Sequence, residues 1–140
     1  MTQIHAYVGF DGRCLEAMNF YKETIGGELS LMPVEGSPME AQCGEAMKGM
    51  ILHSSLIKDG TLLLMATDMT PPGEKPTGSN IALSLNCDSE EEINRLFKTF
   101  SEAGVIVDPL KKQFWGDLFG VCKDKFGISW MMNYSENPSQ

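Results

Sequence analysis

The chain has 140 residues, of which 42% are hydrophobic and 21% are charged, and its formal net charge is −8. This length can bury a sizeable core, and the composition is typical of a single globular domain rather than a disordered chain. Because an acidic surface repels phosphate backbones and anionic lipids, we expect neither nucleic acid nor a membrane as a partner.

The sequence shows no pattern that would direct the chain out of the cytoplasm, so we expect a cytoplasmic protein. Its first residues lack the cationic and apolar regions of a signal peptide, and no apolar run approaches the roughly 18 residues of a membrane span. The cysteines are too widely spaced for a zinc site or a disulfide scaffold, so we expect free thiols in a reducing compartment. They are Cys14, Cys43, Cys87 and Cys122.

The first half of the chain predicts a strand, a helix and three more strands. Apolar residues alternate with other residues over 3–10, which indicates a strand, and apolar residues at helical spacing over 13–25 indicate a helix that ends at Gly26 and Gly27. Residues 35–49 have no period and are rich in Gly, Glu, Pro and Met, which predicts a long loop. The three further strands are expected over residues 28–34, 50–57 and 61–67.

The second half repeats this order after a Pro- and Gly-rich linker over residues 70–78. A strand over 80–86 precedes a helix over 89–101, which Asp88 or Ser89 can cap. Three strands follow, over residues 105–110, 118–123 and 128–133. We therefore divide one domain, residues 1–140, into module 1–69 and module 79–134.

The two halves can be overlaid, which indicates a duplicated unit. Phe20-Tyr21-Lys22 matches Leu96-Phe97-Lys98 at an offset of 76, and Gly60 matches Gly127 at an offset of 67. Each predicted helix is followed by three strands, whereas a ferredoxin-like domain would have the order βαββαβ. The sequence therefore predicts an α+β fold of two βαβββ modules.

Two stretches of sequence carry a family signature. The first is Phe-Asp-Gly-Arg-Cys-Leu-Glu-Ala-Met-Asn-Phe-Tyr-Lys over 10–22, followed by Gly-Gly-Glu-Leu over 26–29. The second is Phe-Trp-Gly-Asp over 114–117, then Phe-Gly over 119–120 and Asp-Lys-Phe-Gly-Ile-Ser-Trp-Met over 124–131. With the repeat, they make the chain resemble the PhnB-like branch of the glyoxalase/bleomycin-resistance/extradiol dioxygenase (vicinal oxygen chelate) superfamily.

The resemblance implies a curled mixed sheet around a cleft, with the helices outside, and a homodimer. It leaves open whether the modules pair within one chain or swap between chains. In metal-dependent relatives such as glyoxalase I, each module gives one ligand from its first strand and one from its last. The matching positions here are His5, Leu64, Asn80 and Met131.

These four positions argue against the usual metal site of the superfamily. Leucine has no lone pair, a thioether is a poor ligand for hard or borderline metals, and a catalytic divalent ion normally needs three protein ligands. We therefore expect no metal and no other cofactor. A rearranged site around His5 and His53 stays open, and its third ligand would come from a turn or loop. The candidates for that ligand are Glu35, Glu40, Glu45 and Asp68.

Strand alternation predicts which side chains line the cleft. The apolar set from Ile4 to Phe10 and the set Ile81, Leu83 and Leu85 should pack under the helices. Leu62, Leu64 and Ala66 should face the cleft on the fourth strand. Trp115 follows Phe114 in a predicted turn, where exposed rings are costly, so it should cover a cleft, a partner chain or the core. The predicted cleft residues are His5, Tyr7, His53, Ser55, Leu64, Asn80, Trp115, Ser129, Met131 and Asn133.

No short motif decides between the possible functions, since the sequence has no G-x-S-x-G, P-loop or G-x-G-x-x-G pattern. The first hypothesis is a metal-free protein that binds a small apolar or aromatic molecule. The second is a metal-dependent lyase, isomerase or dioxygenase that uses His5 and His53. The third is an interaction protein whose dimer surface is the functional part. Whether the chain is an enzyme stays open at this point.

Overall fold

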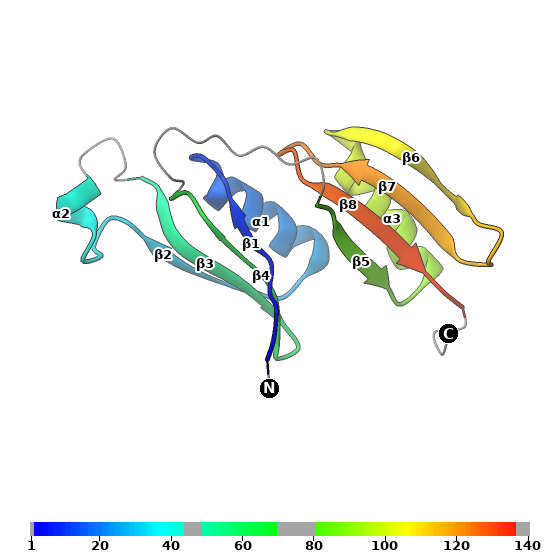
Figure 1. Cartoon of the computed structure of the whole chain (residues 1–140), viewed down its shortest axis with the longest axis horizontal. Coiled ribbons are helices and arrows are strands. Elements are labelled where there is room, and N and C mark those ends of the chain that lie inside the picture. The colour runs from blue at the N-terminus through cyan, green and yellow to red at the C-terminus, as the bar shows by residue number, and fades with distance from the viewer. Residues whose placement is uncertain (1, 44–48, 70–80, 137–140) are drawn as a thin grey trace. The chain divides into compact units, whose positions relative to one another are not determined.

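The computed structural model describes residues 2–43, 49–69 and 81–136. The chain divides into two compact units, Met1–Pro76 and Thr77–Gln140. Figure 1 shows that each unit consists of a sheet and one main helix. Among the described residues, no helix is long and apolar enough to cross a membrane.

The first unit has a four-stranded mixed sheet in the order β1-β4-β3-β2. Strand β1 runs parallel to β4, and the other neighbours are antiparallel. Its elements are β1 (Tyr7–Gly9), α1 (Cys14–Ile25), β2 (Glu28–Pro33), α2 (Glu40–Cys43), β3 (Ile51–Lys58) and β4 (Thr61–Thr67).

The second unit repeats this topology, with the sheet order β5-β8-β7-β6. Strand β5 is parallel to β8, and the remaining pairs are antiparallel. Its elements are β5 (Leu83–Cys87), α3 (Glu90–Glu102), β6 (Val105–Lys112), β7 (Leu118–Lys123) and β8 (Ser129–Tyr134). The predicted pair of βαβββ modules is confirmed.

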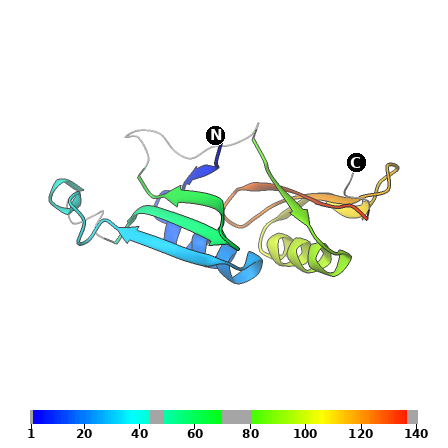
Figure 2. The same ribbon diagram turned by 90° about the horizontal axis from the view of Figure 1, so that it is seen from below.

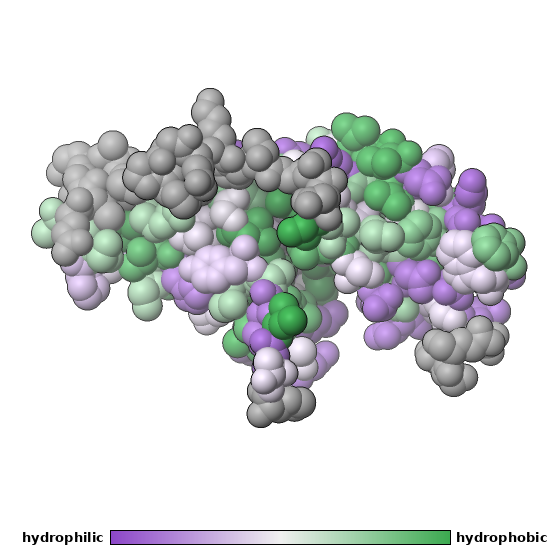
Figure 3. Space-filling model, in the orientation of Figure 1, coloured by the Kyte–Doolittle hydropathy of each residue, from purple (hydrophilic) through white to green (hydrophobic). Residues whose placement is uncertain are grey.

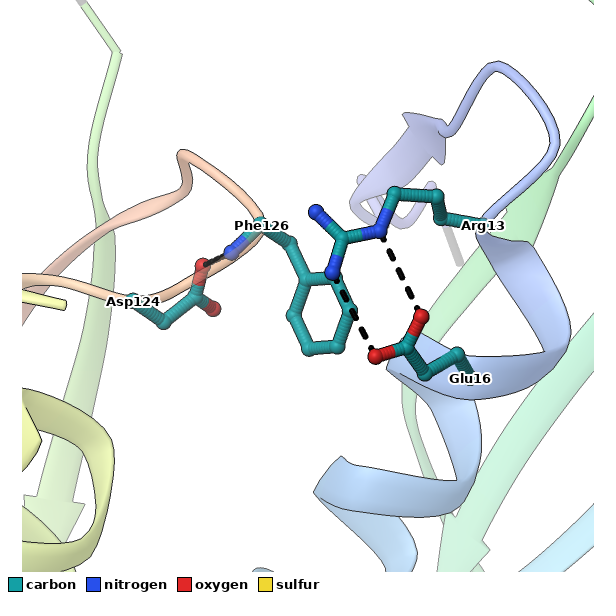
Figure 4. Close-up of polar contacts among 4 residues, drawn as sticks. All are labelled: Arg13, Glu16, Asp124 and Phe126. Carbon is teal, nitrogen blue, oxygen red and sulfur yellow. Dashed lines mark hydrogen bonds and ion pairs between the residues drawn. The ribbon is translucent and has the colours of Figure 1, made fainter. Parts of the chain in front are cut away.

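Helix α1 covers one face of the first sheet (Figure 2). Its buried side chains follow the helical period and include Cys14, Ala17, Met18 and Tyr21. Cys14 shows which face they meet, because its Sγ lies 3.4 Å from the Oγ of Ser54 on β3. On the exposed side of α1, Arg13 and Glu16 form an ion pair of 3.3 Å (Figure 4), which contributes little to stability in water.

Helix α3 covers one face of the second sheet in the same way. Its N-terminus is capped by side chains: Ser89 Oγ accepts the N–H of Glu92 at 3.0 Å, and Glu92 Oε1 accepts the N–H of Asp88, the residue before the cap, at 2.9 Å. Of the two predicted caps, the structure has Ser89. The apolar stripe of α3 includes Phe100, whose ring meets that of Trp130 on β8 edge-on, with centroids 5.1 Å apart.

Each unit also contains one buried aspartate that organises the end of a strand. Asp68 follows β4 and is 3% exposed, and Asp124 follows β7 and is 3% exposed. Asp124 Oδ1 accepts the N–H groups of Phe126 and Ile128, and Oδ2 accepts the indole N–H of Trp130. The first of these bonds is drawn in Figure 4. A buried carboxylate requires such donors, because an unpaired charge is costly to desolvate.

Two glycines, one at the equivalent position in each unit, allow a close approach of the backbone. Gly27 and Gly104 each stand between the helix of a unit and the edge strand that follows it. A Cβ at Gly27 would lie 2.7 Å from the carbonyl oxygen of Ile57, and a Cβ at Gly104 would lie 1.9 Å from that of Lys123. Only glycine lets the backbones approach this closely.

The structure corrects several predicted details. The first strand spans residues 7–9 instead of 3–10, and Ile4 is 95% exposed rather than packed under the helix. Ile81 precedes β5 and is likewise 76% exposed. The predicted loop 35–49 contains the short helix α2. The linker 70–78 lies outside the described residues, and the single-domain organisation stays a prediction.

Candidate functional site

The helix-free face of the first sheet is the first candidate surface, and we call it the first open face. Residues directly opposite each other in neighbouring strands point to the same side of a sheet. Tyr7 pairs with Met65, Met65 with Ser55, and Met32 with His53. These residues alternate with Ser54, which contacts α1, so they face away from the helix.

A tyrosine–histidine pair is the main polar feature of the first open face. The Oη of Tyr7 lies 3.1 Å from the Nδ1 of His53, and the ring centroids are 5.6 Å apart. Tyr7 is on β1 and His53 is on β3, so the contact spans the intervening strand β4. Tyr7, His53 and Ser55 therefore share one face of the sheet, and their role in lining a ligand-binding cleft stays a prediction.

His5 does not join this pair. It lies two residues before β1, is exposed, and its Nε2 is 3.0 Å from Oε1 of Gln3. The structure therefore gives the two histidines different partners. The rearranged site around His5 and His53 would need additional ligands.

Among the described residues, the candidates for those ligands do not come together in a group suited to a metal ion. Asp68 accepts three backbone N–H groups, from Gly12, Cys14 and Ile51, at 2.8–2.9 Å. Glu40 accepts the N–H of Gly36 at 3.1 Å, and Glu45 lies outside the described residues. No group of three His, Cys, Asp or Glu side chains suited to a metal ion occurs within ranges 2–43, 49–69 and 81–136.

The orientation predicted for Leu64 is wrong, and so is that of Ala66. Leu64 is 3% exposed and Ala66 is fully buried, on the helix side of the sheet. Ala66 pairs with Ser54, which fixes this orientation because Ser54 contacts α1. Met65 is the open-face residue at this point of β4.

A β-bulge explains the error. Leu56 pairs with Leu64, but the next residue, Ile57, pairs with Leu62, so Leu63 is an extra residue in β4. The corresponding β7–β8 pairing is regular from Leu118 to Lys123. The offset of 67 between the two halves, which aligned Gly60 with Gly127, therefore becomes smaller by one after Leu63. A shift of one residue along a strand moves every side chain to the other face, so Leu64 was assigned to the wrong face.

The helix-free face of the second sheet is the second candidate surface, and we call it the second open face. Trp130 and Met132 are buried toward α3, so the alternating residues Ser129, Met131 and Asn133 face the other way, and their role in lining a cleft stays a prediction. Met131 is 37% exposed and lies opposite Ser84 on β5. Asn80 lies outside the described residues, so its position stays a prediction.

The loop between β6 and β7 brings aromatic side chains to this face. Trp115 is 48% exposed, and its ring lies beside that of Phe119, with centroids 6.2 Å apart. Phe119 is directly opposite Asn133 on β8. The side-chain amide of Asn133 donates to Asp117 Oδ2 at 3.2 Å, which ties the loop to the sheet. Of the alternatives for Trp115, burial in the core of its own unit is excluded.

The described thiols are unsuited to nucleophilic chemistry. Burial raises the pKa of Cys14 to about 11, with Ser54 opposing and Asp68 adding to the effect. Burial, assisted by Glu92, raises the pKa of Cys87 to about 12. Burial likewise raises the pKa of Cys122 to about 11. Since the thiolate is the reactive form, these residues are structural.

The predicted set of cleft residues does not include Met65, Asp117 or Phe119, which belong to the open faces. Met65 was hidden by the bulge. Phe119 and Asp117 belong to stretches that carry the family signature, but strand alternation alone did not connect Phe119 with Trp115. The contact between these rings depends on the path of the loop from Gln113 to Asp117, which is closed by the Gln113 N–H to Asp117 O bond of 2.8 Å.

Comparison with known proteins identifies the family. The sequence model of the Glyoxalase/Bleomycin resistance protein/Dioxygenase superfamily matches residues 3–132. The chain belongs to this superfamily. It is 30% identical to Protein YjdN of Escherichia coli (strain K12) over 144 aligned positions, covering 96% of this chain and 97% of that protein.

Two solved structures of this superfamily's fold are similar over nearly the whole chain. Protein PA1353 from Pseudomonas aeruginosa is 34% identical with a TM-score of 0.85, and the match covers 96% of this chain and 98% of that one. The Bacillus cereus protein described as a putative 3-demethylubiquinone-9 3-methyltransferase, PhnB protein, is 26% identical with a TM-score of 0.74, covering 96% and 100%. These relatives support the PhnB-like assignment made from the sequence.

Proposed function

We propose that this superfamily member binds a small apolar or aromatic molecule and does so without the usual metal site. The observation that carries the proposal is the second open face. There, Trp115 and Met131 are 48% and 37% exposed, and Phe119 lies beside Trp115. The Asp117–Asn133 bond places polar groups next to this apolar surface.

The chemistry of this surface suits a planar aromatic ligand. Aromatic rings bind other rings by stacking or edge contacts, and methionine adapts its shape to the ligand. Covering roughly 100 Å² of apolar surface contributes about 2.5 kcal/mol. The amide and carboxylate at the edge can then orient a polar substituent, as in most small-molecule sites.

The test is a ligand screen with matched variants. Unlabelled, tag-free protein is screened by thermal shift against small aromatic compounds, and hits are titrated by calorimetry. Trp115→Ala should weaken binding of a hit about tenfold or more, whereas Leu15→Ala is the control. Leu15 is 44% exposed, similar to Trp115, but lies on helix α1 of the other unit. Equal losses in both variants would contradict the proposal.

Metal analysis distinguishes the proposed metal-free function from the metal-dependent alternative. After dialysis without chelator, the proposal expects less than about 0.1 equivalent of nickel, zinc, iron or manganese per chain. Retention of about one equivalent that is lost in His5→Ala or His53→Ala would favour a lyase, isomerase or dioxygenase. The expected cytoplasmic location stays a prediction.

We further propose that the chain forms a homodimer, and the edge strand β6 supports this. Figure 3 shows an apolar patch over the start of β6, where Val105, Ile106 and Val107 are 59%, 52% and 61% exposed. An uncovered apolar edge strand invites pairing with another chain. Ile106→Lys should shift a dimer toward monomer in sedimentation velocity. A wild-type chain that is monomeric at about 100 μM would exclude the dimer.

A further inference from the structure

The Tyr7–His53 pair has features that a structural role does not explain. Tyr7 is 53% exposed, and a hydrogen bond between partly exposed side chains contributes little net stability. The two residues nevertheless reach over β4 from non-adjacent strands to make this 3.1 Å contact. Fixing both rings costs side-chain entropy.

Among the described residues, the neighbours of His53 on the first open face are uncharged. On β2 its direct neighbour is Met32, which is 51% exposed. On β4 the nearest open-face residues are Met65 and Thr67, and the hydroxyl of Thr67 donates to the carbonyl oxygen of Leu52. On β1 the neighbour is Tyr7.

The other titratable groups near this face are few. His5 precedes β1 and contacts Gln3. Glu28 lies opposite Ile57, at the far end of the β2–β3 pair from His53. Among the described residues of the open face, therefore, no carboxylate contacts the imidazole, although the whole chain carries a net charge of −8.

The pair can change what it offers to a ligand when it takes up a proton. In the neutral tautomer that carries its proton on Nε2, the Tyr7 hydroxyl donates to Nδ1, and Nε2–H is the remaining donor of the ring. With a protonated imidazole, both ring nitrogens donate, Tyr7 accepts from Nδ1, and its own hydroxyl hydrogen becomes available. The protonated pair thus presents a positive charge and two donors to solvent.

We propose that Tyr7 and His53 form a proton-linked recognition pair for the acidic group, carboxylate or phenolate, of a small apolar ligand on the first open face. This rests on the proposed small-molecule function and adds to the Trp115 surface of the second open face a second binding surface with its own ligand class. The anion replaces the carboxylate partner that the imidazolium lacks. Met32 and Met65, on the flanking strands, can contact the apolar body of the ligand.

The experiment uses two probes of similar size, benzoate and benzyl alcohol, titrated by calorimetry into the full chain at pH 6 and pH 8. Benzoate is ionised at both values, whereas histidine side chains ordinarily titrate between them. Benzoate should bind at least about tenfold more tightly at pH 6 than at pH 8. Benzyl alcohol should bind equally at both. Repeating the benzoate titration near pH 7 in buffers of different ionisation enthalpy should show net uptake of a fraction of one proton.

Three variants show which residue causes the pH dependence of benzoate binding. His53→Gln should abolish the pH dependence for benzoate. Tyr7→Phe should weaken benzoate binding about three- to tenfold at pH 6, because one donor is lost. His5→Gln is the matched control, and its pH dependence should equal that of the wild type.

The outcomes separate this inference from the function on which it rests. If both probes bind but benzoate shows no pH dependence, or keeps it in His53→Gln, the recognition pair is refuted and small-molecule binding stands. If neither probe binds while other aromatic compounds do, the pair is again refuted. If no aromatic compound binds at all, the proposed function fails and this inference fails with it.

Discussion

The replacement Asp68→Asn tests the hydrogen bonds that join helix α1 to the first sheet. The Asp68 carboxylate is 3% exposed. Its Oδ1 accepts the N–H groups of Gly12 at 2.8 Å and Cys14 at 2.9 Å, and its Oδ2 accepts that of Ile51 at 2.9 Å. Asparagine has the same shape but only one acceptor oxygen, so its NH₂ group must face at least one of these donors.

The expected decrease in the free energy of unfolding follows from the number of hydrogen bonds that Asp68→Asn loses. In the better orientation, the asparagine oxygen keeps the bonds to Gly12 and Cys14, and the N–H of Ile51 loses its acceptor. A buried donor left without a partner costs about 1–3 kcal/mol, and the two retained bonds lose their charge assistance. We expect the free energy of unfolding to fall by about 2–4 kcal/mol, which is large for a small domain with about 5–15 kcal/mol in total.

The measurement is urea unfolding at pH 7, followed by far-UV circular dichroism. Asp59→Asn is the matched control, because Asp59 is exposed in the β3–β4 turn with φ of 52°, a conformation that asparagine adopts readily. It should change the free energy of unfolding by less than about 0.5 kcal/mol. If Asp68→Asn is equally mild, the three bonds do not hold α1 to the sheet as described.

Two further predictions concern the second unit and the thiols. Gly104→Ala should destabilise the chain by at least about 1–3 kcal/mol in the same urea assay, since its Cβ would lie 1.9 Å from the Lys123 oxygen; a neutral effect would mean that the backbone gives way easily. In the native protein, the thiols of Cys14, Cys87 and Cys122 should resist iodoacetamide at pH 7 and react faster at each higher pH, as measured by peptide mass spectrometry. The reason is that their pKa values are raised to about 11 or 12. The same raised pKa values mean that these thiols support folding below the unfolded pKa of about 8.5, and that this support is lost as the pH rises toward 11 or 12. Complete alkylation of native protein at pH 7 would contradict this.

Local sequence patterns were sufficient to predict the main helix and the four strands of each unit. Strands 61–67 and 118–123 were predicted with the bounds that β4 and β7 have, because alternation and turn residues delimit them. The start of β1 was misplaced by four residues. Ile4 continues the apolar alternation, but pairing with β4 begins only at Tyr7, and a strand exists where it finds a partner.

The candidate site was less predictable, because it depends on pairing between distant strands. The Tyr7–His53 contact joins residues 46 positions apart, and alternation gives only their shared face. Trp115 was recognised as unusual from its place in a turn, but its neighbour Phe119 follows from the loop path. The predicted convergence of His5, Leu64, Asn80 and Met131 joins the two units and stays a prediction as a whole, although the orientation of Leu64 within its own unit is now corrected.

The bulge at Leu63 makes a sharp prediction, because it reverses the faces of two adjacent residues. A glutamate at position 64 would enter the core beside Leu56, whereas a glutamate at position 65 would stand on the first open face. Burial disfavours the charged form, so a buried glutamate has a pKa raised by up to several units above its ordinary value of about 4.3.

The sign of the pH effect then distinguishes the two registers. In Leu64→Glu the folded-state pKa lies above the unfolded one, so the variant is most stable below about pH 4.3 and loses stability as the pH rises toward neutrality. Lost packing adds about 2–5 kcal/mol at every pH. We therefore expect the melting temperature of Leu64→Glu to fall further below the wild type at pH 7 than at pH 4.5, with Met65→Glu shifted by only a few degrees and without this trend. Leu64→Gln serves as the uncharged control and should show the packing loss without the pH dependence. If Met65→Glu instead showed the pH-dependent loss, Leu64 would be the open-face residue and the bulge would lie elsewhere in β4.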